Sequence, residues 1–396
     1  MSNQTLPDDW KVLPLSQLGS FSKGKSITKA DLQNDGQPCI RYGEIYTLHD
    51  HSVKRFHSFI NAELARSCKK LKFNDLLFAG SGETLEEIGK AVGYRLKQEA
   101  FAGGDIVILS LKDQYRSDYL AYYLNSQGRK QINKFGTGHS VVHIYSRDLE
   151  KIFVTLPPVH IQDEIVSILN QWDTAIQTTE ALIDAKERQF GWLVTRLINK
   201  SGHKKKQLSD FISEVSVRNR GNEMDRVLSV INHSGFVLQE DHFERRVASA
   251  NVSNYKIVYQ GQYAYNPSRI NVGSIARLDD WDNGILSPMY TVFKLDHKIV
   301  NSDYFLHWLS SSEAKQRIKK SAQGSVRETV SFGDLGAIPV CLSELTVQQN
   351  IAHTLNTAQQ EIKLLKQLVR KYRTQKRGLM QKLLSGEWHI KNKEAT

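Results

Sequence analysis

The chain has 396 residues, and its 53 lysines and arginines outnumber its 42 acidic residues to give a formal net charge of +11. This length predicts at least two separate hydrophobic cores. A composition of 40% hydrophobic and 9% aromatic residues excludes an intrinsically disordered protein. Three cysteines far apart in the sequence argue against a disulfide scaffold. Because the sequence shows neither a membrane-length apolar run nor a signal-like start, we expect a soluble, cytoplasmic protein. The positive charge permits a nucleic-acid partner without proving one.

The first predicted domain covers residues 1–155 and has the composition of strands and turns. Short apolar runs at residues 76–78 and 106–109 alternate with glycines, which is typical of strands joined by tight turns. Residues 117–135 instead carry apolar side chains at helical spacing. The pattern therefore predicts a mixed domain of α-helices and β-strands.

A long amphipathic helix is predicted over residues 156–202. Its apolar residues recur at heptad spacing, which is the pattern of a coiled-coil seam. Within this segment Pro157 and Pro158 mark the start of the helix, and Gly202 is its stop signal. The seam positions are Ile165, Leu169, Ile176, Ile183, Leu193 and Leu197.

The second predicted domain, residues 203–341, repeats the mixed composition of the first. Residues 258–265, 273–276 and 290–295 have the composition of strands, and residues 302–320 have helical spacing.

A second long helix is predicted over residues 342–388, ahead of a short tail at residues 389–396. More than half of the net positive charge lies in residues 342–396. Such a run indicates either a solvated helix face or a face for phosphate or an acidic partner. The seam positions of this helix are Ile351, Leu355, Ile362, Val369, Leu379 and Leu383.

The chain contains one internal repeat. Residues 156–198 align with 342–384 without a gap, and ten positions are then identical, most of them apolar and at helical spacing. We call this the repeat alignment. Upstream of it, residues 117–119 match 302–304, both Ser-Asp-Tyr. The sequence therefore predicts two copies of one unit of roughly 190 residues.

An apolar helix seam cannot stay exposed in a monomer, so we expect the two long helices to pack on each other as an antiparallel coiled coil. Each mixed domain would then lie at an opposite end, and a pseudo-twofold axis would relate the two copies. The predicted fold class is α+β, with two mixed α/β domains joined by two long helices.

Catalytic and cofactor-binding signatures are missing from the sequence. The glycine-rich loop at residues 79–84 lacks the Gly-Lys-Ser/Thr of a phosphate-binding loop, and residues 264–269 lack the second proline and the aromatic of an adenine-methyltransferase motif. His49 and His51 with Asp50 could coordinate a metal, but a solvated loop is favoured. We therefore predict no catalytic residue and no metal site.

Several strings resemble the specificity subunit of type I restriction–modification enzymes. These are the opening Leu-Pro-Asp-Asp-Trp at residues 6–10, the segments 21–25 and 40–46, and the Leu-Pro-Pro of residues 156–158. Residues 342–351 depart from the pattern because they lack both prolines. The resemblance spans the whole chain, and the order of the strings and their doubled layout make it specific.

The resemblance implies a non-catalytic subunit that reads DNA sequence. Each mixed domain would be a target-recognition domain for one half of a bipartite, asymmetric site in double-stranded DNA. The coiled coil would dock two methyltransferase subunits, which methylate adenine, and the motor-nuclease restriction subunits would join them. S-adenosylmethionine and ATP-Mg are expected on those partners, and no cofactor is expected on this chain.

Basic, amide and other polar loop side chains are the groups that usually contact phosphates and base edges. The candidates in the first domain are Lys23, Lys25, Arg41, Tyr42, Ser81, Lys90 and His139. The candidates in the second domain are Arg218, Arg220, Arg245, Arg246, Asn266, Arg269, Asn271 and Arg327. An ordinary surface or turn role is the alternative for each of them, and the seam residues would serve helix packing and partner docking.

Two other functions remain open at the level of sequence. The chain could be a self-contained site-specific methyltransferase or nuclease with an undetected active site, or a coiled-coil scaffold that reads no sequence. Methyl transfer by the lone chain would favour the enzyme. Weak DNA binding that is equally salt-sensitive for every sequence would favour the scaffold.

Overall fold

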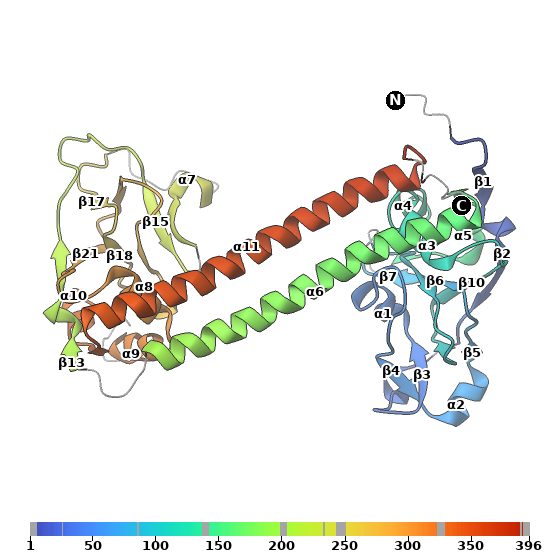
Figure 1. Ribbon diagram of the computed structural model, residues 1–396, viewed down its shortest axis with the longest axis horizontal. Helices are drawn as coiled ribbons and strands as arrows, with labels where there is room; N and C mark the ends of the chain where they lie inside the picture. Colours follow the sequence, from blue (N-terminus) through green and yellow to red (C-terminus); the bar gives the residue numbers. More distant parts are fainter. Residues whose placement is uncertain are drawn as a thin grey trace, which may run out of the picture. The chain divides into compact units, whose positions relative to one another are not determined.

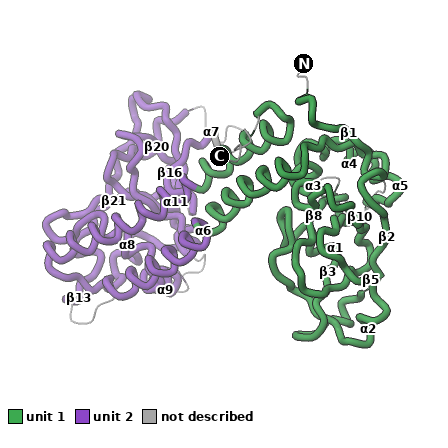
Figure 2. The backbone as a smooth tube through the Cα atoms, turned by 45° about the vertical axis from the view of Figure 1, so that its right-hand side comes forward, with its two compact units in different colours: residues 1–178, 369–396 green, residues 179–368 purple. Residues whose placement is uncertain are grey.

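The computed structural model describes residues 6–25, 27–84, 87–136, 142–198, 204–232, 234–242, 251–322, 329–388 and 390. The chain divides into two compact units, one of residues 1–178 with 369–396 and one of residues 179–368 (Figure 2). Each unit holds one mixed α/β domain together with part of each of the two long helices.

The first unit is built on a four-stranded antiparallel sheet with the order β2-β10-β6-β8. Its strands are β2 (Gly19–Lys23), β10 (Ile106–Leu111), β6 (Asp75–Ala79) and β8 (Ala91–Tyr94). Leu76, Phe78 and Leu109 on one face join helix α3 (Ser117–Leu124) in the main core of this unit. Side chains alternate between the two faces of a strand, so the neighbouring Leu77 lies in a second core on the other face.

A second sheet of short strands extends the first unit, with the order β4-β3-β9-β5 and a parallel pairing of β3 with β9. The remaining elements before the long helix are β1 (Lys11–Pro14), β3 (Gln37–Ile40), β4 (Ser58–Ile60), β5 (Lys69–Lys70), β7 (Ser81–Gly82), β9 (Phe101–Ala102), β11 (Val142–His143), β12 (Phe153–Leu156), α1 (Tyr42–Thr47), α2 (Ala62–Ser67), α4 (Arg129–Asn133), α5 (Ser146–Leu149), and the 3₁₀ turns η1 (Leu15–Gln17) and η2 (Lys29–Asp31).

The second unit repeats the central sheet of the first. The order β14-β21-β18-β19 is the counterpart of β2-β10-β6-β8, and all its pairs are antiparallel. Its strands are β14 (Ile212–Val215), β21 (Thr291–Leu295), β18 (Tyr263–Tyr265) and β19 (Ile275–Arg277). Tyr263 and Phe293 pack against Phe305 of helix α8 (Ser302–Ser310), as Leu76 and Leu109 pack near α3.

The outer part of the second unit differs from that of the first. It contains the antiparallel pairs β15-β16 and β17-β20, whereas the first unit has a second four-stranded sheet; the pair β13-β22 matches β1-β12. The remaining elements are β13 (Lys204–Gln207), β15 (Leu228–Ile231), β16 (Gly235–Leu238), β17 (Lys256–Tyr259), β20 (Asn283–Leu286), β22 (Pro339–Leu342), α7 (Gln239–His242), α9 (Ser312–Ala322), α10 (Phe332–Gly336), and the 3₁₀ turns η3 (Leu208–Asp210) and η4 (Ile270–Val272).

One predicted strand, residues 258–265, is in fact two. Strand β17 ends at Tyr259 and β18 begins at Tyr263, with Gly261 in the left-handed conformation at a φ of 80° between them. Only glycine adopts that conformation without strain, so the chain turns there. Tyr259 is consequently exposed, while Tyr263 is fully buried.

The two long helices, α6 (Val159–Ile198) and α11 (Leu345–Leu384), are each 40 residues long, and their first and last residues coincide in the repeat alignment (Figure 1). They run antiparallel where they meet. In the first unit Trp172 contacts Tyr372 edge to face, and in the second unit Lys186 pairs with Glu361. The predicted antiparallel pairing of the helices is confirmed.

The seam residues predicted from the heptad pattern are largely buried. Ile165, Leu169, Ile176, Ile183, Ile351, Leu355, Ile362, Val369 and Leu383 are each less than 10% exposed, and Leu193, Leu197 and Leu379 are half-buried. In the first unit the seam joins the core under α3, and in the second it joins the core under α8. Each domain is therefore fused to the helices through one continuous core.

A duplicated glutamine fixes each domain to its helix. Gln162 is buried, its Oε1 accepts from the backbone N–H of Arg116 at 2.9 Å, and its Nε2 donates to the carbonyl of Pro157 at 2.9 Å. Gln348 makes the equivalent bonds with the N–H of Asn301 and the carbonyl of Ser343, both at 2.9 Å. These bonds explain why glutamine is identical in the two copies, since they satisfy backbone groups that are buried at the junction.

Candidate nucleic-acid interface

In the first unit, several predicted DNA-contacting residues lie on loops that meet at the turn before β10. The N–H of Lys25 donates to the carbonyl of Ala102 at 3.2 Å, and the N–H of Gly103 donates to the carbonyl of Ile40 at 2.8 Å. The N–H of Gly80 donates to the carbonyl of Asp105 at 2.7 Å. The segments that carry Lys23, Lys25, Arg41 and Ser81 therefore adjoin one another, and we call them the first-unit loop cluster.

Glycines permit this close approach of loops. A Cβ on Gly24 would lie 1.9 Å from the carbonyl oxygen of Gly103, and a Cβ on Gly80 would lie 2.7 Å from that of Asp105. Any side chain at either position would push the loops apart. At Gly24 and Gly80, therefore, the backbones of neighbouring loops are in direct contact.

The cations of the first-unit loop cluster are held in different ways. Lys23 and Asp105 form an exposed ion pair at 3.0 Å, which a phosphate can replace at little cost. Arg41 Nε donates to Glu44 Oε1 at 3.1 Å, and the buried Glu44 also accepts from the hydroxyl of Ser58. The buried carboxylate orients the guanidinium, which is the arrangement that base or phosphate recognition requires.

Tyr42 lies beside Arg41 at the start of α1. Its ring is 37% exposed and lies 6.2 Å from the ring of Tyr46, tilted with respect to it. An exposed aromatic next to an oriented arginine can contact a sugar or a base face.

Two predicted residues of the first unit bond within the domain. Ser81 is buried and its hydroxyl lies 2.9 Å from Nδ1 of His143. Lys90 Nζ donates to the carbonyl of His49 at 2.7 Å, and burial lowers its pKa. Both side chains therefore hold loops of the domain together, and His139 lies outside the described residues.

In the second unit Arg218 and Arg220 project from one fixed loop. Between them the buried Asn219 donates to the carbonyl of Met224 at 2.8 Å and accepts from the N–H of the same residue at 3.2 Å. Arg218 Nη1 donates to the carbonyl of Asn254 at 2.7 Å. Both arginines are exposed, so the loop presents two cations on a rigid base.

Asn266, Arg269 and Asn271 share the connection between β18 and β19. Asn266 Oδ1 accepts from the N–H of Ser268 at 3.0 Å, which folds the start of the loop. Arg269 is exposed, and Asn271 is half-buried at the rim of a cavity described below. Arg245, Arg246 and Arg327 lie outside the described residues.

The described part of the chain shows no metal centre and no membrane span. No three His, Cys, Asp or Glu side chains among the described residues lie close enough to hold a metal ion, and His49, Asp50 and His51 do not converge. No described helix is long and apolar enough to cross a membrane.

Sequence reasoning missed two lysines of α9, Lys315 and Lys319, which face the cavity of the second unit. The available signal was the basic composition of the predicted helix 302–320, which ends with three lysines and one arginine. Which of them would line a cavity depends on the packing of α9 against the η4 turn and α8, and no local pattern shows those contacts.

The chain thus joins each of two mixed α/β domains to a shared pair of long helices, and the first domain carries cations on loops that meet at glycines. The family model of the type I restriction modification DNA specificity domain matches residues 7–187. The specificity subunit of the type I restriction enzyme MjaVIII of Methanocaldococcus jannaschii is 20% identical over 99% of this chain and 96% of its own length.

Solved structures show the same fold. The S subunit of a type I restriction–modification system from M. genitalium matches 98% of each chain with a TM-score of 0.60 at 14% identity. A chain from a study of the assembly and conformational transition of the type I R-M system matches 97% of this chain and 100% of its own, with a TM-score of 0.59 at 11% identity. Residues 7–187 of this chain therefore resemble the type I restriction modification DNA specificity domain, and the whole chain shares the fold of the solved S subunit.

Proposed function

We propose that the chain reads a bipartite, asymmetric site in double-stranded DNA, with one half-site for each mixed domain. The duplication carries this proposal, because the same sheet order and the same glutamine anchor occur in both units. A scaffold built twice can present two separate sets of loops to two segments of one DNA molecule.

The differences between the units support an asymmetric target. The second sheet and helix α1 carry Arg41 and Tyr42 in the first unit, whereas the β18-β19 connection carries Asn266 and Arg269 in the second. Side chains of different chemistry at different places on the scaffold favour different base edges. The two half-sites should therefore differ in sequence.

We further propose that the long helices dock two methyltransferase subunits and the restriction subunits. In the first unit a groove beside α6 is lined by Asn170, Gln171, Thr174 and Ala175 of the helix together with Arg95 and Asp118 of the mixed domain. The outer face of α11 in the second unit has a groove at the matching positions of the repeat alignment, lined by Asn356, Thr357, Gln360 and Glu361. Grooves at equivalent positions of a repeat suit two copies of one partner.

In this proposal the chain itself supplies only sequence reading and assembly. S-adenosylmethionine and ATP-Mg would be bound by the methyltransferase and restriction subunits, and the complex would act on DNA in the cytoplasm. The purified chain should neither bind S-adenosylmethionine nor methylate DNA. Methyl transfer by the chain free of other subunits would support the alternative of a self-contained enzyme.

The test is to express the chain with its methyltransferase subunit and to sequence the modified adenines. We expect one motif of two specified parts separated by an unread spacer. Arg41→Ala should relax bases in one part and Arg269→Ala bases in the other, with Lys298→Ala, an exposed turn residue, as the control. A motif in one continuous part, or two variants that affect the same part, would contradict the proposal.

A further inference from the structure

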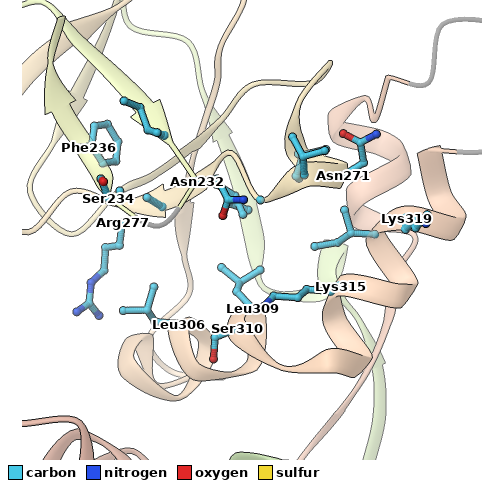
Figure 3. A pocket seen from close by; sticks show the side chains of 18 of the residues that line it. Asn232, Ser234, Phe236, Asn271, Arg277, Leu306, Leu309, Ser310, Lys315 and Lys319 are labelled. Atoms are coloured by element: carbon cyan, nitrogen blue, oxygen red, sulfur yellow. The ribbon is translucent and has the colours of Figure 1, made fainter. Parts of the chain in front are cut away.

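The second unit contains a cavity of about 680 Å³ beside the edge strand β19. Its walls come from β19, the turn between β15 and β16, the η4 turn, and helices α8 and α9. Figure 3 shows Leu306 and Leu309 of α8 and Lys315 of α9 on the helix side and Asn232 on the side of the turn. The cavity thus combines an apolar floor, a strand edge and a cationic end.

The first unit has a strand edge at the equivalent position. Gly93 of β8 pairs with Leu76 in the sheet, as Arg277 of β19 pairs with Tyr263. Leu76 and Tyr263 each lie in the core beneath the helix that follows the sheet. Gly93 and Arg277 are therefore counterparts.

In the first unit a segment of the chain itself covers this edge. The N–H of Gly93 donates to the carbonyl of His51 at 2.9 Å, and its carbonyl accepts from the N–H of Val53 at 3.0 Å. Ser52 forms a parallel bridge with Gly93. Residues 51–53 thus act as a short parallel strand added to β8.

The side chains of this segment rest on α3. The ring of His51 stacks on Tyr122 with centroids 4.0 Å apart, and its Nδ1 lies 3.3 Å from Nδ2 of Asn125. Helices α3 and α8 can be aligned on their shared Ser-Asp-Tyr, residues 117–119 and 302–304. In this alignment His307 takes the position of Tyr122, and Ser310 takes that of Asn125. Ser310 lines the cavity of the second unit, so the cavity lies where the first unit has its own added segment.

The edge strand β19 has backbone hydrogen-bonding groups that are not used within the sheet. In an antiparallel sheet, residue pairs that are hydrogen-bonded to each other alternate with pairs that are not. The N–H of Leu278 donates to the carbonyl of Gln262 at 2.9 Å, so the next pair, Tyr263 and Arg277, is not hydrogen-bonded to each other. The N–H and the carbonyl of Arg277 consequently face the cavity side of the strand. Neither has a hydrogen-bond partner among the residues that the structure describes.

Charge indicates what kind of segment fits. In the first unit Asp50, next to the added segment, lines one small cavity with Lys90 and Arg129. In the second unit the cavity is lined by Lys315 and Lys319 and also by Asp279 and Asp280. Asp279 is paired with Arg277, whereas the exposed Lys315 and Lys319 have no ion-pair partner among the described residues.

We propose that this cavity binds an extended, acidic segment of a partner protein, which adds to β19 as a parallel strand. Its backbone would bond to the N–H and the carbonyl of Arg277, as residues 51–53 bond to Gly93. A flat or aliphatic side chain would rest on Leu306 and Leu309, and a carboxylate would meet Lys315 and Lys319. The site requires only the second unit and does not rest on the proposed reading of DNA.

The test uses the full chain and a labelled peptide that copies residues 48–53, which includes the segment that covers the edge in the first unit and carries Asp50. Fluorescence anisotropy should show saturable binding. The double variant Lys315→Glu with Lys319→Glu should weaken it at least fivefold, whereas Lys320→Glu, exposed on the same helix and not in the cavity, should leave it unchanged.

Strand addition is separated from other binding by N-methylation of the peptide. A methyl group on the nitrogen equivalent to Val53 removes the N–H that bonds to the strand edge, and binding should be lost. The same group at Ser52 removes an N–H that points away from the strand, and binding should persist. Hydrogen exchange of the backbone amide of Arg277 should slow when the unmodified peptide binds.

Three results would overturn the proposal. They are no binding at millimolar peptide, equal binding of the two N-methylated peptides, and protection of the Arg277 amide by a mononucleotide and not by the peptide.

Discussion

Lys376 donates a hydrogen bond to Asp173 between the two long helices, and only 14% and 13% of these side chains are exposed. Asp173 also accepts from the hydroxyl of Tyr122 at 2.5 Å. The repeat alignment places Gln359 at the position of Asp173 and Phe190 at that of Lys376, so the ion pair occurs in one copy of the repeat only. The pair therefore helps to distinguish the two helices, as does the Lys186–Glu361 pair, whose repeat positions are Tyr372 and Ala175.

The first prediction concerns this pair. Lys376→Met leaves the Asp173 carboxylate without its counter-charge and should lower the free energy of unfolding by about 3 kcal/mol. The double variant Lys376→Met with Asp173→Leu should recover most of that loss, because Tyr122 keeps Asn170 as an acceptor at 2.9 Å. Urea denaturation measures both variants. A double variant as unstable as the single one would contradict this account.

The second prediction concerns a fragment that ends at residue 202. It retains one domain and one long helix with an uncovered seam, so we expect it to form a homodimer in which a second copy supplies the missing helix. With methyltransferase subunits it should modify a palindrome that contains the first half-site twice. Sedimentation velocity and sequencing of modified sites are the measurements, and a stable monomer would refute the prediction.

The third prediction concerns the stability of that homodimer. Asp173 would face Phe190 of the second copy, since Phe190 stands at the repeat position of Lys376. Phe190→Lys in the fragment should restore the ion pair and lower the dissociation constant of the dimer about tenfold, which is about 1.4 kcal/mol. The same change in the full chain should destabilise it, because Phe190 there packs against the core of the second unit. Equal effects in both backgrounds would disprove the proposed register.

The fourth prediction separates helix packing from partner docking. Leu355 is fully buried in the seam, and Leu355→Asp should cost on the order of 4 kcal/mol through lost packing and a buried charge. Leu364 is 53% exposed in the groove on α11, so Leu364→Asp should leave folding intact and weaken assembly with the methyltransferase subunit. Denaturation and size-exclusion light scattering test the two effects. Normal assembly of Leu364→Asp would rule this groove out as a docking surface.

The long helices were predictable because their information is local and repeated. Heptad spacing marks the seam, and the identity of Gln162 with Gln348 in the repeat alignment marks the junction with each domain. Such signals need no knowledge of distant contacts, and the structure has two 40-residue helices whose bounds coincide in that alignment.

The loop cluster and the cavity could not be predicted in the same way. Gly24 and Gly80 are needed because Gly103 and Asp105 approach them, and those partners are dozens of residues away. The cavity exists because no described segment of the second unit lies where the first has residues 51–53. A sequence pattern does not show that a contact is missing. The pattern of residues 258–265 likewise did not predict the turn at Gly261.

The fifth prediction concerns the pH dependence of stability in the first unit. Burial lowers the pKa of His49 and of His51 to about 4, and nearby Lys376 adds to the effect at His51. The unfolded chain has ordinary histidines of pKa about 6.5, so between pH 6.5 and 4 it binds protons that the native chain does not. The free energy of unfolding should therefore fall as the pH drops through this window, by roughly 3 kcal/mol for each histidine. His51→Gln should remove its share of that slope, whereas His297→Gln, which changes an exposed side chain, should not. Denaturation curves at half-unit steps of pH measure the slopes, and identical slopes for the two variants would show that His51 titrates normally in the folded protein.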